Sequence, residues 1–174
     1  RGDVEGTGTV MIVVSNTSPL TNLAAIGHFD LLRRLYGELH ITQGVWEELN
    51  ARGQPWPGRN EVATADWIER HSAQNRPLIT ALQRDLDQGE AESIALALEL
   101  EVDLILLDER EGRHAAQRMG LHVVGVVGVL LEAKAHGIIH TIRPLLDGLR
   151  QTAGFYLSES LYQHALTLAD ETST

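Results

Sequence analysis

The sequence predicts an α/β fold with a central parallel sheet covered by helices on both faces, a three-layer α/β/α sandwich. Short apolar runs of strand length alternate along the chain with longer segments of helical periodicity. The short runs are almost uninterruptedly apolar, as is typical of strands buried on both faces. The chain has 174 residues, 43% of them hydrophobic, and can therefore bury a core. We expect a single domain over residues 11–170, with a helical extension from about residue 141.

The expected strands are rich in Val, Ile and Leu and are bounded by residues that favour turns or helix caps. Trp67 and Ile68 are expected to form a further small strand or the end of a helix. In chain order, the strands are expected at 10–14, 39–42, 104–107 and 121–124.

The expected helices are segments in which apolar residues recur every three or four positions. The first helix follows the segment 15–19, because Asn, Ser and Thr cap helices and Pro suits a first turn. A loop is expected over 53–60, where two prolines and two glycines prevent regular structure. In chain order, the helices are expected at 20–26, 28–36, 43–50, 78–86, 89–101, 112–119, 126–135, 143–151 and 158–168.

Several classes of protein are excluded by composition. The absence of cysteine excludes a disulfide framework, a thiolate zinc site and a cysteine nucleophile. No apolar run is long enough to cross a membrane, and no secretory signal pattern opens the chain, so we expect a cytoplasmic protein. Residues 1–10 lack periodicity, and we expect them to be a disordered or artificially added extension outside the fold, with Met11 as a candidate natural start.

The charge balance leaves a metal-dependent enzyme open. The chain carries 14 Lys and Arg against 24 Asp and Glu, a net charge of −10. Such a surface repels nucleic acid at long range and argues against a nonspecific backbone binder, although a local basic rim is compatible with it. Acids gathered in one cleft also produce a negative balance, and divalent cations bind to such clusters.

Two polar residues follow directly on predicted strands, Asn16 after the first and Asp108 after the run 104–107. In open parallel sheets, ligands bind beyond the carboxyl ends of the strands. A solvated turn residue or a helix cap explains an acid at such a position equally well.

Two glutamates lie on or beside the apolar face of a predicted helix. At 100° per residue, Glu47 points away from the apolar face of the helix at 43–50, whereas Glu48 lies on its flank. In the helix after Gly89, Glu90 shares its side with the buried residues. Gln88, Glu92 and Glu99 share the stripe that we expect to face solvent. Favourable interaction with the helix dipole explains an acid in the first turn but not its place on the apolar side.

Other motifs carry less information. His136 and His140 have the spacing of helical zinc ligands, but Gly137 interrupts them and no acid of an HExxH motif lies between them. Gly125 and Gly128 follow a strand but lack the first glycine of the dinucleotide fingerprint. Neither a phosphate-binding GxxxxGK[ST] loop nor a GxSxG motif is present.

The order of these segments resembles the PIN domain, the small α/β nuclease fold of VapC-type toxins. The resemblance is to the subgroup with a Ser-Asp-Thr-Ser-Pro-Leu opening and a later Gly-Glu-Ala-Glu block. Five segments in order, spread over most of residues 11–168, carry it. They are Ile12-Val13-Val14-Ser15-Asn16-Thr17-Ser18-Pro19-Leu20, Val45-Trp46-Glu47-Glu48-Leu49, Gly89-Glu90-Ala91-Glu92, Leu106-Leu107-Asp108-Glu109-Arg110-Glu111-Gly112-Arg113 and Gly125-Val126-Val127-Gly128.

The resemblance implies a nuclease that holds Mg²⁺ or Mn²⁺ with carboxylates and hydrolyses phosphodiester bonds, usually in RNA. Hard cations prefer such oxygen ligands and activate water while offsetting charge on the phosphate. By position, the implied catalytic and metal-binding residues are Asn16, Glu48, Glu90 and Asp108. Ser18 matches a small polar residue that supports the site. Arg110 and Arg113 are implied phosphate contacts, with surface ion pairs to neighbouring glutamates as the alternative.

This chain departs from the family at Asn16, where the family has aspartate. Asparagine offers a carbonyl oxygen but no negative charge, so metal affinity should fall. A weakly active natural variant, a catalytically silent domain that binds protein or RNA, and an engineered substitution are all compatible with it. The resemblance also implies an antitoxin partner and a homodimer. The last helix has an apolar stripe (Leu157, Leu161, Ala165, Leu168). This stripe is explained by contact with an antitoxin or a second copy, or by packing in the core.

Overall fold

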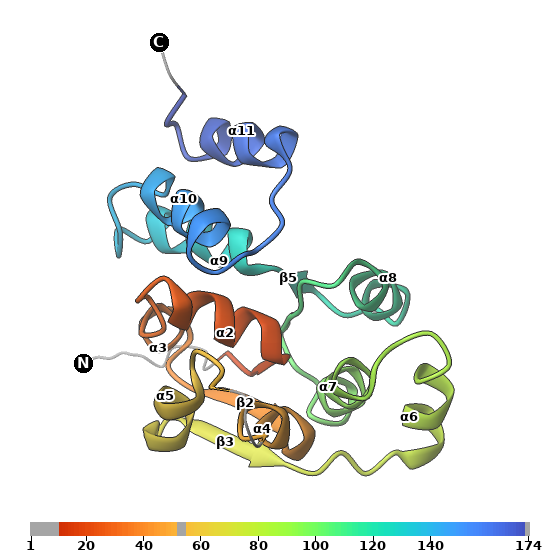
Figure 1. The fold of residues 1–174 in the computed structure, drawn as a ribbon. Coiled ribbons are helices and arrows are strands. Elements are labelled where there is room, and N and C mark those ends of the chain that lie inside the picture. Colours follow the sequence, from red (N-terminus) through yellow and green to blue (C-terminus); the bar gives the residue numbers. More distant parts are fainter. Residues whose placement is uncertain (1–10, 52–54, 173–174) are drawn as a thin grey trace, which may run out of the picture.

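A computed structural model describes residues 11–51 and 55–172, and within them five strands form one all-parallel sheet (Figure 1). The strand order is β3-β2-β1-β4-β5. The strands are β1 Val13–Ser15, β2 Leu39–Thr42, β3 Ile68–His71, β4 Leu104–Leu106 and β5 Val123–Val124. The predicted α/β fold with a central parallel sheet is confirmed.

Helices connect the strands and follow the last one. They are α2 Thr17–Ala25, α3 Leu31–Tyr36, α4 Gln43–Leu49, α5 Arg59–Thr64, α6 Arg76–Leu82, α7 Gln88–Glu99, α8 Arg110–Arg118, α9 Val126–Ala135, α10 Arg143–Gln151 and α11 Glu159–Leu168. The sequence predicted α9 and α10 with these bounds. It missed α5, which begins at the end of the expected loop; part of that loop, and the expected extension 1–10, lie outside the described residues.

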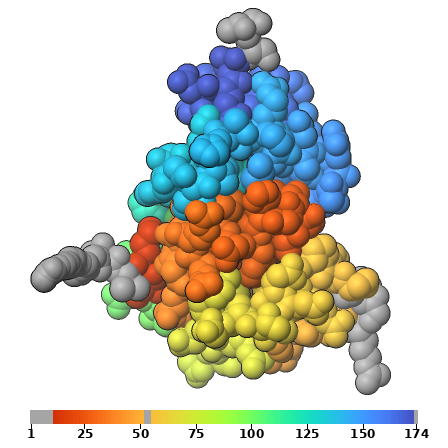
Figure 2. All heavy atoms as spheres, turned by 90° about the vertical axis from the view of Figure 1, so that its left-hand side faces the viewer, coloured from red at the N-terminus to blue at the C-terminus, as the bar shows by residue number. Residues whose placement is uncertain are grey.

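The sheet separates two hydrophobic cores. Successive residues of a strand point to opposite faces, so Val13 joins one core and Val14 the other. The first core packs against α2, α3, α4, α5, α9, α10 and α11, and the second against α6, α7 and α8. Helices therefore cover both faces (Figure 1). The C-terminal helices form one end of the molecule, opposite the end that contains β3 (Figure 2).

Successive strands are added to one side of β1 and then, from β4 onwards, to the other side, which is a reversal of the strand order. From β1 the chain adds β2 and β3 on one side, and then β4 and β5 on the other. Val14 pairs with His40 of β2 and with Ile105 of β4, so β1 lies in the middle of the sheet. Ligand sites of open parallel sheets lie at such a reversal, beyond the carboxyl ends of the strands.

No helix among the described residues is long and apolar enough to cross a membrane.

A carboxylate near the C-terminus ties α9 to α10. Glu171 accepts hydrogen bonds from the backbone amides of Ile142 (2.7 Å) and Arg143 (3.2 Å) and pairs with Lys134 Nζ at 2.8 Å. Burial opposes ionisation of Glu171, but Lys134 and the two amides outweigh it and lower its pKa below the ordinary value.

Glu171→Gln is therefore expected to lower the free energy of unfolding by about 1–3 kcal/mol at neutral pH. A depressed carboxyl pKa stabilises the fold fully above the unfolded-state pKa, and this contribution is lost as the pH falls through the folded-state pKa. Thermal unfolding of the wild type and the variant at pH 7 and pH 4 measures the effect. A difference between the two proteins that does not shrink in acid would contradict this electrostatic account.

Candidate functional site

The candidate site lies at the carboxyl ends of β1 and β4, the neighbouring strands between which the strand order of the parallel sheet reverses. Asn16 follows β1 and Asp108 follows β4 after one further residue, and β1 and β4 are neighbours. The backbone amide of Asn16 donates to the carbonyl oxygen of Leu106 at 3.0 Å, which fixes the two strand ends beside each other. Both polar residues therefore lie at the same edge, as expected from their place after apolar runs.

Asn16 is buried and occupies the N-cap position of α2, but its side chain makes no capping hydrogen bond. An asparagine at this position normally accepts a hydrogen bond from an amide of the first turn. Here its Oδ1 instead lies 3.4 Å from the hydroxyl of Ser93 on α7. The Asn16 oxygen thus points across the sheet edge towards α7 and away from its own helix.

Glu48 reaches the same edge from α4. Thr42 caps this helix by accepting a hydrogen bond from the Val45 amide at 3.0 Å, which begins α4 directly after β2. The hydroxyl of Thr17, next to Asn16, donates to Glu48 Oε1 at 2.7 Å. A methyl group on Gly89 would lie 3.3 Å from Glu48 Oε1 and 3.4 Å from Asn16 Oδ1, so both oxygens approach the first turn of α7.

Glu90 is buried in that first turn. Its amide and its Oε1 form a capping box with Asp87, in which Glu90 N donates to Asp87 Oδ1 (2.8 Å) and Asp87 N donates to Glu90 Oε1 (3.2 Å). Burial raises the pKa of Glu90; the charges of Asp87, Glu109 and Glu48 raise it further, and its backbone contact to Asp87 lowers it. Glu90 therefore lies in a crowded field of negative charge.

Asp108 lies opposite, between α2 and α9. Its Oδ1 accepts from the Val126 amide at 2.9 Å, and Ser18 Oγ lies 3.5 Å from its Oδ2. Burial raises the pKa of Asp108 to about 6 and Glu109 adds to the rise, whereas the Val126 amide, Arg113 and Ser18 oppose it. Ser18 also accepts a hydrogen bond from Asn22 at 3.0 Å, so it connects α2 to this carboxylate.

The predicted acids lie at the same carboxyl end of the sheet, but their side chains do not form a closed cluster. Within the described part of the chain, the trio of potential His, Asp and Glu ligands with all ligand atoms within 4.8 Å is His40, Glu69 and His71, on β2 and β3. Glu48, Glu90 and Asp108 are therefore more widely spaced than that. A cavity of about 410 Å³ between α4 and the start of α7 is lined by Glu48 and Gly89, and a separate one of about 400 Å³ is lined by Asp108 and Arg113.

The two arginines of the fourth segment differ in their surroundings. Arg113 donates to the carbonyl oxygen of Leu107 at 3.2 Å and lies close to Asp108, whereas Arg110 is exposed at the start of α8. No ion pair within 4.0 Å joins either arginine to Glu109 or Glu111, all four being described residues. The surface ion pairs considered from the sequence are therefore not formed.

Gly125 leaves room for Asp108 and Arg113. A methyl group at this position would lie 2.7 Å from Asp108 Oδ1 and 2.8 Å from an Arg113 guanidinium nitrogen. Gly125→Ala is therefore expected to break the Val126–Asp108 hydrogen bond and to lower the free energy of unfolding by about 1–3 kcal/mol. Urea denaturation measures the free energy of unfolding of the variant and the wild type. An unchanged denaturation midpoint would contradict the close packing around Gly125.

The expectation that Glu92 faces solvent is wrong. Glu92 is only 8% exposed, and its Oε1 has no hydrogen-bond partner among the described residues. Its Oε2 accepts from Gln88 at 3.2 Å and lies 3.7 Å from Arg76. A methyl group on Gly44 would overlap Glu92 Oε1, so the start of α4 covers this side of α7. A single-helix periodicity cannot reveal a second packing partner.

Sequence reasoning also missed the residues that orient the acids. Thr17, Asp87, Ser93 and Glu109 contact or electrostatically influence Glu48, Glu90, Asn16 or Asp108. Asp87 carried a usable signal, because Asp followed three residues later by Glu is a helix-start pattern of the capping-box kind.

The donor set fits a hard divalent cation. The four candidate ligands, Asn16, Glu48, Glu90 and Asp108, offer oxygen as carboxylate or amide carbonyl, and Mg²⁺ and Mn²⁺ prefer such ligands. Partly buried carboxylates that repel one another, with raised pKa values at Glu90 and Asp108, are stabilised by a cation. Glu48, Glu90, Asp108 and the Asn16 carbonyl would be the residues to hold it.

The fold and the site together define an α/β protein with an acidic site at the carboxyl ends of a parallel sheet, where the strand order reverses. The family model of the PIN domain matches residues 12–171, and the chain belongs to the PIN domain family. Its fold is thus of the nuclease type, since PIN domains are commonly nucleases acting on nucleic acids with divalent metals. A search of curated proteins found no match to the chain.

Proposed function

We propose that this protein is a ribonuclease of the VapC-like toxin type that hydrolyses phosphodiester bonds in RNA with Mg²⁺ or Mn²⁺. The observation that carries the proposal is the approach of Asn16, Glu48, Glu90 and Asp108 to one edge from four different parts of the chain. Membership of the PIN domain family supports hydrolysis of nucleic acid.

The chain's own residues divide the work. Glu48, Glu90 and Asp108 bind the ion, and Asn16 adds a neutral oxygen. Thr17 and Ser18 hold Glu48 and Asp108 by their hydroxyl groups. A bound Mg²⁺ or Mn²⁺ supplies Lewis acidity towards the phosphodiester. Arg113 lies beside Asp108, and Arg110 is exposed one helical turn before Arg113; we expect both to contact phosphate oxygens.

The test compares two neighbouring glutamates on α4. Purified protein with Mn²⁺ is expected to cleave RNA, and Glu48→Gln is expected to lower the rate at least about tenfold because a ligand charge is lost. Glu47→Gln removes the same charge one residue away and is expected to leave the rate unchanged. Equal rates for both variants, or no cleavage even in the Asn16→Asp protein, would refute the ribonuclease.

A catalytically silent PIN domain that binds protein or RNA is the second candidate. The amide at Asn16 favours it, because this buried position lacks the charge that the family's aspartate brings. Calorimetric titration with Mn²⁺ separates the two functions. Binding that is lost in Asp108→Ala supports the enzyme, and the absence of binding supports the silent domain.

An antitoxin and a second copy of the chain belong to the same proposal. The expected apolar stripe is divided: Leu157, which precedes α11, and Ala165 are buried, whereas Leu161 is exposed and Leu168 is 61% exposed. The buried half explains core packing, and the exposed half is available for a protein contact. Light scattering after gel filtration tests the homodimer; a monomer at high concentration would contradict it.

A further inference from the structure

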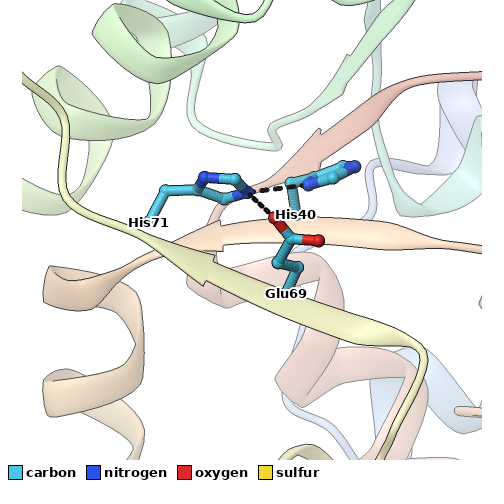
Figure 3. A group of neighbouring side chains, drawn as sticks. All are labelled: His40, Glu69 and His71. Atoms are coloured by element: carbon cyan, nitrogen blue, oxygen red, sulfur yellow. Dashed lines mark hydrogen bonds and ion pairs between the residues drawn. The ribbon is translucent and has the colours of Figure 1, made fainter.

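A second group of potential metal ligands lies on β2 and β3, and it shares no residue with the acidic edge formed by Asn16, Glu48, Glu90 and Asp108. It consists of His40 on β2 and Glu69 and His71 on β3, whose side chains point towards one another from the two strands (Figure 3). The nitrogens His40 Nδ1 and His71 Nε2 lie 2.8 Å apart, and Glu69 Oε1 lies 3.2 Å from His71 Nε2.

The strand register produces this grouping. His40 pairs with Glu69 across the parallel ladder, and Glu69 and His71 are two residues apart on one strand. Residues at that spacing point to the same face of a sheet, so all three side chains share the face of α6 and α7. The register of β2 against β3 therefore sets which face the three side chains share.

A carboxylate, Glu38, lies beside the outer ring nitrogen of His40. Its Oε1 lies 3.2 Å from His40 Nε2, the ring nitrogen that points away from the group. The tautomer of His40 with its hydrogen on Nε2, the nitrogen beside the Glu38 carboxylate, presents the lone pair of Nδ1 to His71 and Glu69. In metal sites, a carboxylate beside the outer nitrogen of a ligating histidine orients the ring and makes the ligating nitrogen a better donor.

Hydrogen bonds alone satisfy this group poorly. With His40 Nδ1 unprotonated, one hydrogen at most, on His71 Nε2, faces two acceptors, His40 Nδ1 and Glu69 Oε1. With that hydrogen on the other nitrogen of His71, three lone-pair atoms face each other. His40 is only 8% exposed, so water compensates it little. A cation at the centre satisfies all three atoms at once.

We propose that His40, Glu69 and His71 bind one divalent transition metal ion of the Zn²⁺ class, separately from the acidic edge. Two imidazoles and one carboxylate are typical ligands of Zn²⁺, which leaves a fourth position for water. Mg²⁺ prefers the oxygen-only set at the other site. The bound ion joins edge strand β3 to β2 and stabilises the fold by mass action.

The experiment measures Zn²⁺ binding by competition with a chromogenic chelator, and four-coordinate geometry by the visible absorption of Co²⁺. Wild type is expected to bind one Zn²⁺ at this site, with its Tm rising by about 5 °C at a hundredfold excess over Kd. His71→Gln is expected to abolish the binding and the Tm shift. Glu38→Gln is expected to weaken binding about 10–100-fold, because the negative charge beside the outer nitrogen of His40 is lost.

Matched variants separate this site from the acidic edge. His114→Gln, an exposed histidine on α8, is expected to leave Zn²⁺ binding intact, and so is Asp108→Asn. Glu69→Gln changes an exposed side chain and serves if His71→Gln fails to fold. Zn²⁺ binding that survives Glu69→Gln and His71→Gln, or that is lost only in Asp108→Asn, or that is absent from folded wild type, would overturn the proposal.

Discussion

Asn16→Asp is expected to raise Mn²⁺ affinity about tenfold or more and to raise the rate of RNA cleavage with it. The buried Asn16 Oδ1 approaches the same turn of α7 as Glu48 and points away from its own helix. Aspartate at this position adds a full negative charge beside the ion, and about 1.4 kcal/mol of added attraction suffices for a tenfold gain. Calorimetry and a labelled RNA substrate measure the two quantities.

The control for this variant is Asn60→Asp, which makes the same change in net charge at an exposed position of α5. It is expected to alter neither affinity nor rate, since solvent screens a charge there. Metal affinity that does not change in Asn16→Asp would show that this position takes no part in binding the ion.

Asp108→Asn is expected to lower Mn²⁺-dependent cleavage about a hundredfold or more while leaving the fold intact. Asparagine still offers an oxygen to the Val126 amide but removes the charge needed by the ion. Because burial raises the pKa of Asp108 to about 6, the ionised form costs stability above that pH. The Tm at pH 8 is therefore expected to stay equal or rise.

This opposite movement of activity and Tm separates loss of a ligand from unfolding. Asp85→Asn, at an exposed position before α7, is the matched control and should change neither quantity. An Asp108→Asn protein that cleaves at the wild-type rate would remove Asp108 from the metal site.

Sequence periodicity predicted the sheet and the buried position of Glu90, because both follow from local patterns. The strand at 39–42 and the helix at 126–135 have the bounds expected from apolar spacing. Glu90 lies on the buried side of α7, as its angle relative to Ile94 indicated. These features depend on one element and the sheet behind it.

The parts that could not be predicted depend on contacts between distant elements. Glu92 is buried because α4 covers α7, and no pattern within 88–99 records that contact. The His40–Glu69–His71 group requires the register of β2 against β3, which the sequence does not state. The orientation of the Asn16 side chain, away from its own helix and towards α7, likewise depends on Ser93, 77 positions away.

The most direct test is a crystal structure of the protein grown with Mn²⁺, in which anomalous scattering locates the ion. If the protein is the proposed ribonuclease, the anomalous peak places a manganese ion at metal–oxygen distances of roughly 2.0–2.2 Å from Glu90 and Asp108. Glu48 or Asn16 supplies a further ligand oxygen. Manganese found only elsewhere on the protein, with these carboxylates pointing apart, would contradict it.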